Sequence, residues 1–354
     1  AEAGQVGNTQ AGGQSTLDSR VAGGEDAPDH PWAESPAATP ATPLLQAAAM
    51  TLDVNSRPPD SQPDAERPAA AADAFTPLAL RRHAADQDER DAIGRLNFLH
   101  GAGERRAALL ALILTPGSAR EKQAWREETA EVASAGRVRA DVARLSAASR
   151  LPVFELLLQR SRNVPVAERQ ALVEAARCVM GADGQVRPID RLHWLAMRHV
   201  LGEAGATPVA ASGSDNDPAA LPLASVEQFA SLTAWLARLV PAPVDLNAKG
   251  AVSKAGNAWY ESAISQWVQR YRAQGRRAPA CHPPDADGMA HALWAVQALS
   301  WMLKPVLLRA WVDAAVSMSA KATLLPEAAD ALRLLALLLD TPMPPALAEH
   351  FLEV

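Results

Sequence analysis

Residues 166–201 read VAERQALVEAARCVM, then GADGQVR, then PIDRLHWLAMRHVL, and this stretch decides the fold. In its first and last parts, apolar residues recur at the three- and four-residue spacing that places them on one face of a helix. Between them, Gly184 can take the left-handed conformation of a tight turn, and Pro188 suits the opening of a helix. The stretch therefore predicts two helices, 166–180 and 189–201, joined by a short loop.

Similar helical patterns lie on both sides of this hairpin, from residue 76 to the end of the chain. Gly and Pro residues separate them. Apolar residues make up 48% of the chain and aromatic residues only 5%, a composition rich in Ala and Leu that excludes an all-β protein. We expect an all-α fold of two helical bundles. The other expected helices are 88–100, 103–115, 118–133, 138–149, 152–159, 225–239, 255–273, 287–302, 305–319, 326–339 and 344–352.

Two segments lack this pattern and divide the chain. Residues 1–75 contain eleven Asp or Glu against three Arg, with nine Pro, so they cannot bury enough apolar surface to offset the entropy of ordering and are expected to form a disordered acidic linker. Residues 203–223, rich in Gly, Ser, Asp and Pro, predict a second linker. The helical domains are then 76–202 and 224–354. Because the chain begins with Ala1 and not Met, we expect it to be a fragment of a longer protein.

The two domains share an internal similarity. Residues 171–176 (ALVEAA) align with residues 310–315 (AWVDAA) at an offset of 139. Residues 186–188 (VRP) align with residues 324–326 (LLP) at an offset of 138. This pattern indicates a duplicated helical hairpin. The alternative is that two Ala- and Leu-rich amphipathic helices align this well through composition alone.

The loop of the first hairpin carries a family resemblance. Its sequence, Gly181-Ala182-Asp183-Gly184 followed by an apolar residue and then Asp190, resembles the helical hairpin of tellurite-resistance protein B (TerB)-like domains. Together with the runs LPVFELLL (151–158), RHVL (198–201) and LDTPMPP (339–345), it resembles the C-terminal region of bacterial HtpX-like zinc metallopeptidases over roughly residues 90–347. The second hairpin departs from this pattern, because AKAT (320–323) stands where Ala-Asp-Gly is expected.

The resemblance implies a membrane-anchored parent with a zinc-binding His-Glu-x-x-His helix, joined to this region by an acidic linker. None of the eight histidines of this chain begins such a motif, which needs two ligands and a general base on one helical turn. We therefore expect this chain to be non-catalytic and to carry no cofactor, with zinc confined to the absent peptidase domain. No apolar run approaches the roughly 18–20 residues that span a bilayer, so we expect no membrane span in this chain. The resemblance implies that the chain is a cytoplasmic segment of an inner-membrane parent.

The expected function is an accessory, regulatory or substrate-recruiting role in proteolysis and protein quality control, through contact with a protein partner or with its own peptidase domain. The groove between the halves and the Trp-rich second half are the candidate surfaces. One alternative is a free-standing TerB-like helical scaffold or stress-response adaptor with no protease attached. Another is an enzyme of unrecognised type, which would need a polar pocket with convergent ionisable groups.

Metal binding has two candidate ligands in this sequence, Asp183 and Asp190, because hard cations prefer several carboxylate oxygens. No third ligand is in view, and the spacing does not match an EF-hand loop. The sequence favours turn geometry for Asp183 and an early-helix position for Asp190. His193 and His199 are six residues apart on one helix, so we expect them to point to different sides.

Charge excludes nucleic acid as a partner and leaves one basic patch. The net charge is -6, and most basic clusters are interleaved with acids, as in residues 120–128, which we interpret as a solvated helix face. The exception is the group Arg270, Arg272, Arg276 and Arg277, a candidate contact for anionic lipid headgroups. Helical spacing predicts core positions for six tryptophans: Trp235, Trp259, Trp267, Trp294, Trp301 and Trp311.

Overall fold

The computed structural model describes residues 86–202, 221–243, 252–319 and 323–352. These residues form helices and no strand, so the expected all-α class is confirmed for them. The predicted linker 1–75 and most of the linker 203–223 lie outside the described residues. Within the described ranges, no helix combines the length and the apolar character needed to cross a membrane.

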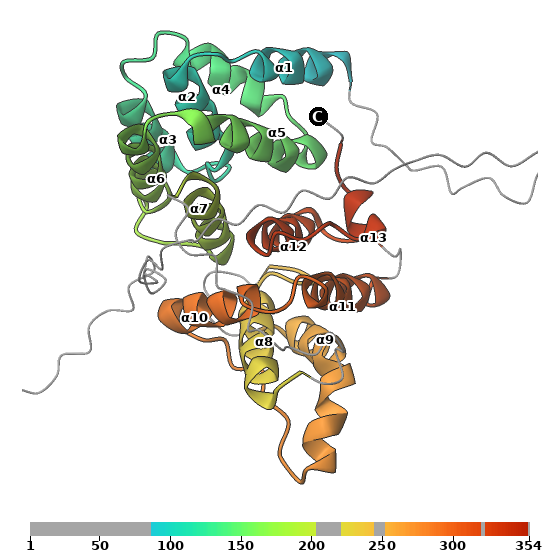
Figure 1. Cartoon of the computed structure of the whole chain (residues 1–354). Coiled ribbons are helices and arrows are strands. Elements are labelled where there is room, and N and C mark those ends of the chain that lie inside the picture. Colours follow the sequence, from blue (N-terminus) through green and yellow to red (C-terminus); the bar gives the residue numbers. More distant parts are fainter. Residues whose placement is uncertain (1–85, 203–220, 244–251, 320–322, 353–354) are drawn as a thin grey trace, which may run out of the picture.

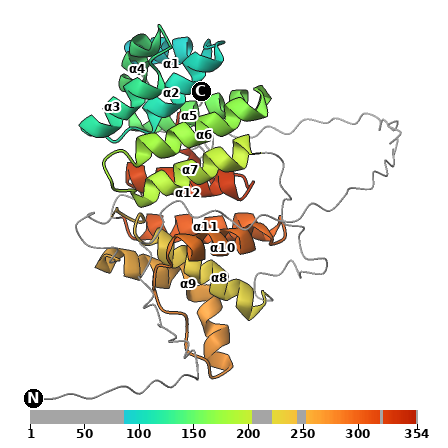
Figure 2. The same ribbon diagram turned by 90° about the vertical axis from the view of Figure 1, so that its left-hand side faces the viewer.

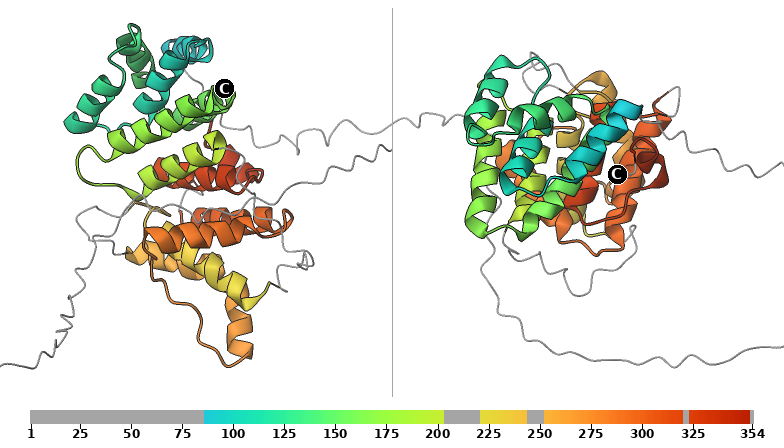
Figure 3. Two further views of the ribbon diagram at one scale, coloured as in Figure 1. Left: turned by 60° about the vertical axis from the view of Figure 1, so that its left-hand side comes forward. Right: turned by 90° about the horizontal axis from the view of Figure 1, so that it is seen from above.

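The helices stack in layers (Figures 1 and 2). The layer of α1–α4 lies at one end of the stack, followed by α5 and α6, then α7 beside α12, then α10 and α11, with α8 and α9 at the other end (Figure 3). The bounds are α1 Gln87–Asn97, α2 Ala102–Leu112, α3 Ala119–Glu128, α4 Ala135–Ala143, α5 Ala147–Arg160, the 3₁₀ turn η1 Ser161–Asn163, α6 Val166–Met180, α7 Pro188–Leu201, α8 Leu223–Leu236, α9 Lys254–Ala273, α10 Ala286–Gln297, α11 Leu303–Ser317, α12 Pro326–Leu338 and α13 Pro345–Ala348.

The helical hairpin predicted from residues 166–201 is confirmed as α6 and α7. The segments aligned with it fall on α11 and α12, and α7 and α12 both begin with a proline in the first helical turn. The two second helices, α7 and α12, pack against each other and join the two halves. Residues 320–322, which carry most of the departure from Ala-Asp-Gly, lie outside the described residues.

Helix α5 differs from its prediction, because Pro152 was expected to open a helix and instead lies inside one that begins at Ala147. Proline has no N–H to donate to the carbonyl four residues earlier, which here belongs to Ala148. That carbonyl accepts the N–H of Leu352 at 3.0 Å, so the C-terminal segment supplies the missing donor. The C-terminus therefore lies against α5, as Figure 1 shows.

One hydrophobic core extends through both halves, from Leu96 to Leu347. Polar contacts reinforce the junction: the guanidinium of Arg333 on α12 donates to both carboxylate oxygens of Glu155 on α5, at 2.9 and 2.7 Å. The sequence left open whether the halves pack together, and the shared core shows that they do in this structure.

Four of the six tryptophans predicted to be core are buried, whereas Trp294 is half-buried and Trp301 is exposed. Trp235, Trp259, Trp267 and Trp311 are buried. Trp301 is 77% exposed, so its predicted core position is wrong. The prediction assumed a helix to residue 302, but α10 ends at Gln297 and leaves Trp301 in the turn that follows, where helical spacing no longer applies.

Candidate functional site

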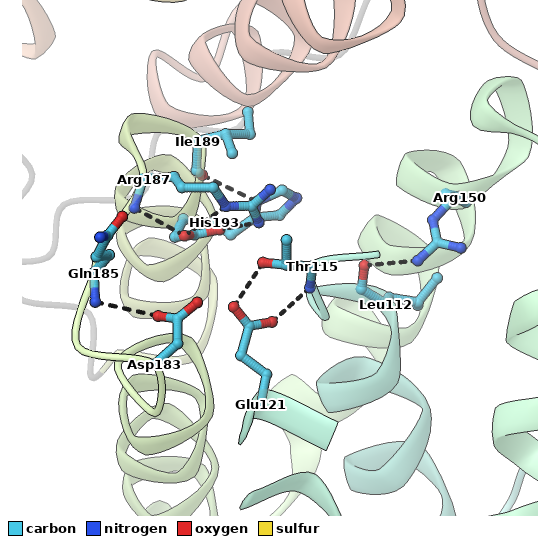
Figure 4. Close-up of polar contacts among 10 residues, drawn as sticks. Leu112, Thr115, Glu121, Arg150, Asp183, Gln185, Arg187, Ile189 and His193 are labelled. Carbon is cyan, nitrogen blue, oxygen red and sulfur yellow. Dashed lines mark hydrogen bonds and ion pairs between the residues drawn. The ribbon is translucent and has the colours of Figure 1, made fainter. Parts of the chain in front are cut away.

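The loop between α6 and α7 folds as its residue types predict. Gly184 has a φ of 83°, the left-handed region in which a side chain is disfavoured. The Asp183 carboxylate accepts the backbone N–H of Gln185 at 3.1 Å, the local turn expected for aspartate two residues before its donor (Figure 4). Arg120 of α3 reaches over to the Asp183 carbonyl at 3.4 Å, so the loop is tied to a neighbouring helix.

Asp190 lies in the first turn of α7 and is 2% exposed. Its carboxylate accepts the Arg187 backbone N–H at 2.9 Å and the Arg187 guanidinium at 3.0 and 2.6 Å. Burial raises the pKa of the Asp190 carboxyl above its usual value, while these three hydrogen bonds oppose the rise. The early-helix role expected for Asp190 is therefore observed, with Arg187 as the partner that satisfies its charge.

Glu121 of α3 lies near this loop and is only 2% exposed. The prediction that residues 120–128 form a solvated helix face is therefore wrong at Glu121. The Glu121 carboxylate accepts the N–H and the hydroxyl of Thr115, at 2.5 and 2.6 Å (Figure 4). Burial raises its pKa, and the nearby charge of Asp190 adds to the rise. The sequence pattern that points to Glu121 is Ser-x-x-Glu, which begins at Ser118 and is typical of a helix N-terminus. In the structure, the Ser118 hydroxyl accepts the Glu121 backbone N–H at 3.2 Å.

Asp183 and Asp190 are not brought together with a third ligand. Within the part of the chain that the structure describes, no group of three or more His, Cys, Asp or Glu side chains is placed to hold a metal ion. The oxygens of Asp190 are bonded to Arg187, and one oxygen of Asp183 is bonded within its own turn. The donor set of this loop does not fit a divalent cation.

His193 and His199 point to different sides of α7, as expected. His193 lies edge-on to the Phe154 ring at 5.2 Å, and its Nδ1 donates to the Ile189 carbonyl at 3.0 Å. Burial lowers the pKa of His193 to about 4, so the imidazole is neutral at physiological pH. His199 Nε2 is 2.9 Å from Asp340 Oδ1, which follows α12, and this contact is another link between the halves.

Asp330 on α12 is a half-buried residue at the α5–α12 junction, where Arg150 and Glu155 of α5 act on its carboxyl. Burial raises its pKa to about 7, although Arg333 and Arg150 attract its negative charge, and Glu327 and Glu155 add to the rise. A carboxyl whose pKa is higher in the folded than in the unfolded state binds more protons when folded. Its contribution to stability is therefore present at low pH and is lost as pH rises from about 4 to 7.

We predict that Asp330→Asn leaves the free energy of unfolding unchanged near pH 4 and raises it by about 1–3 kcal/mol at pH 8, because the amide resembles the protonated acid and needs no buried charge. Urea unfolding followed by circular dichroism at each pH measures the difference. Comparison with the unsubstituted chain at the same pH cancels the titration of His193 and all other groups. A difference that does not change with pH would show that Asp330 is ionised at little cost.

A groove with a volume of about 710 Å³ lies at the junction and is here named the interhalf groove. Helices α6 and α7 form one side, and Leu293 and Gln297 of α10 with Leu338 of α12 form the other. Gln297 donates to the Leu338 carbonyl at 2.7 Å and so fixes the second side. The groove is therefore built by helices from both halves. The sequence indicated a groove between the halves as a candidate surface but did not identify the residues that line it.

The interhalf groove carries an excess of positive charge. Its charged lining is Arg169, Arg177 and Arg198 against Glu174. Arg177 is paired with Glu174, with one Nη2–Oε1 distance of 2.5 Å. Arg169 donates to the carbonyls of Leu201 and Gly202, at 2.8 and 3.2 Å, and these contacts leave its charge unneutralised.

Arg198 is the groove cation with the fewest contacts. Its guanidinium carbon lies 4.9 Å from the centre of the Trp194 ring. No carboxylate within the described ranges forms an ion pair with it. Trp194 is itself 4% exposed, so the guanidinium of Arg198, which lines the groove, lies over a buried ring.

The predicted basic patch lies at the C-terminal end of α9 and in the loop after it, the lower tip of the molecule in Figure 1. Arg272, Arg276 and Arg277 are exposed, and Arg270 belongs to α9. Arg276 lies over the Tyr271 ring and is 3.6 Å from Glu227 of α8, an acid that reduces the local charge. The contact of this patch with anionic lipid stays a prediction.

In comparisons with protein-family models, curated proteins and solved structures, nothing significant matches this chain. The residues and contacts described above are therefore the basis for assigning a role.

Proposed function

We propose that the helical region is a non-catalytic binding region that recruits partner or substrate segments to a membrane-anchored zinc metallopeptidase, as its C-terminal part. The observation that carries the proposal is the interhalf groove, which is built from both halves and holds three arginines against one glutamate. The sequence resemblance to the C-terminal region of HtpX-like metallopeptidases supports the attachment to a protease on the inner membrane.

The occupant that fits this groove is an acidic polypeptide segment. Arg169 and Arg198 bring charge that no carboxylate within 4 Å offsets among the described residues, and the accessible Val166 and partly buried Val173 offer apolar contact. Acidic side chains placed between these arginines would form the charge-assisted hydrogen bonds that carry specificity at protein interfaces. A volume of about 710 Å³ accommodates several residues of an extended segment.

The test is the binding of a fluorescent acidic peptide to the full chain, measured by anisotropy. A suitable probe has the sequence of residues 21–35, VAGGEDAPDHPWAES, which contains four acids and no Lys or Arg. The control probe replaces each acid by its amide. We expect the acidic probe to bind, with an affinity that falls as salt rises, and the amide probe to bind weakly.

Two groove variants are expected to change this affinity in opposite directions. Arg198→Gln should weaken binding by about five-fold, because it removes one charge contact worth about 1 kcal/mol. Glu174→Gln should strengthen binding, because it removes the one acid of the lining and frees Arg177. Arg162→Gln, an exposed arginine outside the groove, is the matched control. Equal affinity for all four proteins would refute the groove as the binding site.

Attachment to a protease is tested separately, by the coding sequence upstream of Ala1. Membrane-spanning segments and a His-Glu-x-x-His motif in the same reading frame are the expected result. A start codon close to Ala1 with no such coding sequence would instead favour a free-standing TerB-like scaffold that uses the same groove.

A further inference from the structure

A second pocket lies within the first half, between the loop of residues 113–118 and helices α3, α4 and α5. Its volume is about 480 Å³, and it shares no lining residue with the interhalf groove. We call it the cationic pocket, because its charged lining is Lys122 of α3, Arg139 of α4 and Arg150 of α5 and includes no carboxylate. Three helices thus bring three positive charges to one cavity.

None of these three cations forms an ion pair with an acid among the described residues. Arg139 lies over the Trp125 ring at 5.5 Å. Arg150 donates only to the carbonyls of Val142 and Leu112, at the long distances of 3.5 and 3.3 Å. Burial lowers the pKa of Arg150, and the charge of the nearby Asp330, which forms no ion pair with Arg150 among the described residues, opposes this shift.

Some other arginines of the same half are paired with acids, whereas the cations of this pocket are not. Arg95 and Arg144 both contact Asp141, and Arg106 contacts Glu128. Like charges that line one cavity in half-buried positions repel one another, and a bound anion would relieve that repulsion. The cationic pocket therefore has the electrostatic character of an anion site.

The rest of the lining divides into a polar and an apolar wall. The polar wall is the loop from Thr115 to Ser118, which leads into the start of α3, where the first backbone N–H groups have no acceptor within the helix. The acid of that first turn, Glu121, is bonded to Thr115 and does not line the pocket. The apolar wall includes Leu114 and Val142.

We propose that the cationic pocket binds a small organic phosphate monoester, with the phosphate between Lys122, Arg139 and Arg150 and the organic part against the apolar wall. A dianion matches a site of three cations better than a single carboxylate does. The volume of about 480 Å³ lies in the range of small-molecule sites and exceeds what a bare ion fills.

The experiment uses phenyl phosphate as the probe and the full chain as the receptor, with binding measured by isothermal titration calorimetry. We expect phenyl phosphate to bind more tightly than inorganic phosphate, because only the ester reaches the apolar wall. Affinity should fall as pH is lowered from about 7.5 to 5, because the second pKa of a phosphate ester is about 6. Phenyl sulfate, a monoanion throughout this range, should bind more weakly and show no such dependence.

Variants locate the site. Lys122→Gln and Arg139→Gln should each weaken phenyl phosphate binding by about ten-fold, the loss of one charge-assisted contact. Arg126→Gln on α3 and Arg137→Gln on α4 are matched controls, because both residues are exposed and neither lines the pocket. Arg139 also packs on Trp125, so circular dichroism and urea unfolding must show that its variant is folded, and Lys122→Gln has no such contact to lose.

Several results would overturn the proposal. They are no binding of phenyl phosphate at millimolar concentrations, equal binding to the folded Lys122→Gln variant, and equal loss in the Arg126 and Arg137 controls. Equal affinity for phenyl phosphate and inorganic phosphate would also overturn it, since the apolar wall would then contribute nothing.

Discussion

Asp190→Ala is expected to lower the free energy of unfolding by about 3–5 kcal/mol, the loss typical of breaking a buried ion pair by removing one partner. The substitution leaves the Arg187 guanidinium, whose side chain is only 22% exposed, without its carboxylate. It also removes the acceptor of the Arg187 backbone N–H at the start of α7. Since domains are commonly stable by about 5–15 kcal/mol, this loss is a large fraction of the total.

Two further variants separate the contribution of the Asp190–Arg187 ion pair from that of the hydrogen bond to the Arg187 backbone N–H at the start of α7. Asp190→Asn keeps one oxygen, which can still accept the Arg187 backbone N–H and Nε–H, but places an NH2 group near Nη2, so its loss should be smaller, about 1–2 kcal/mol. Asp183→Ala removes only a hydrogen bond within an accessible turn and should cost less than about 1 kcal/mol. Urea unfolding followed by circular dichroism measures all three. If Asp190→Ala is as stable as Asp183→Ala, the ion pair with Arg187 contributes nothing and our account of this helix start is wrong.

The first hairpin was predictable from sequence because its determinants are local. The spacing of apolar residues, Gly184 in the turn and Pro188 at the helix opening lie within a few residues of what they specify, and α6 and α7 are observed within one residue of the expected bounds. Helix α5 was not predictable in this way. Pro152 is tolerated inside it where the Ala148 carbonyl has another donor, and that donor is Leu352, two hundred residues away.

The candidate sites were predicted less completely than the fold. Helical spacing identifies which face of a helix is apolar, but it does not say which charged residues from separate helices meet. Arg139 and Arg150 lie on different helices, and only their packing places them in one cavity with Lys122. The interhalf groove likewise depends on the contact between α7 and α12. Glu121 is the exception, since the capping pattern with Ser118 was present in the sequence.

Trp311→Ala is expected to lower the free energy of unfolding by about 3–5 kcal/mol, because it opens a cavity in the core of the second half. Trp311 is 0% exposed, its ring stacks on Phe229 at 5.2 Å, and its Nε1–H donates to the Thr233 hydroxyl at 2.9 Å. Trp311→Phe keeps most of the volume but not the hydrogen bond, so we expect an intermediate loss.

Trp301→Ala is the matched control for Trp311→Ala, and because Trp301 is 77% exposed its stability should stay within about 0.5 kcal/mol of the unsubstituted chain. Since one core runs through both halves, Trp311→Ala should also make the first half easier to unfold. Trypsin should then cleave α1–α7 at a lower urea concentration in the Trp311→Ala chain than in the Trp301→Ala chain. Cleavage of the first half at unchanged urea would mean that the halves unfold independently, and that the contact between α7 and α12 does not couple them.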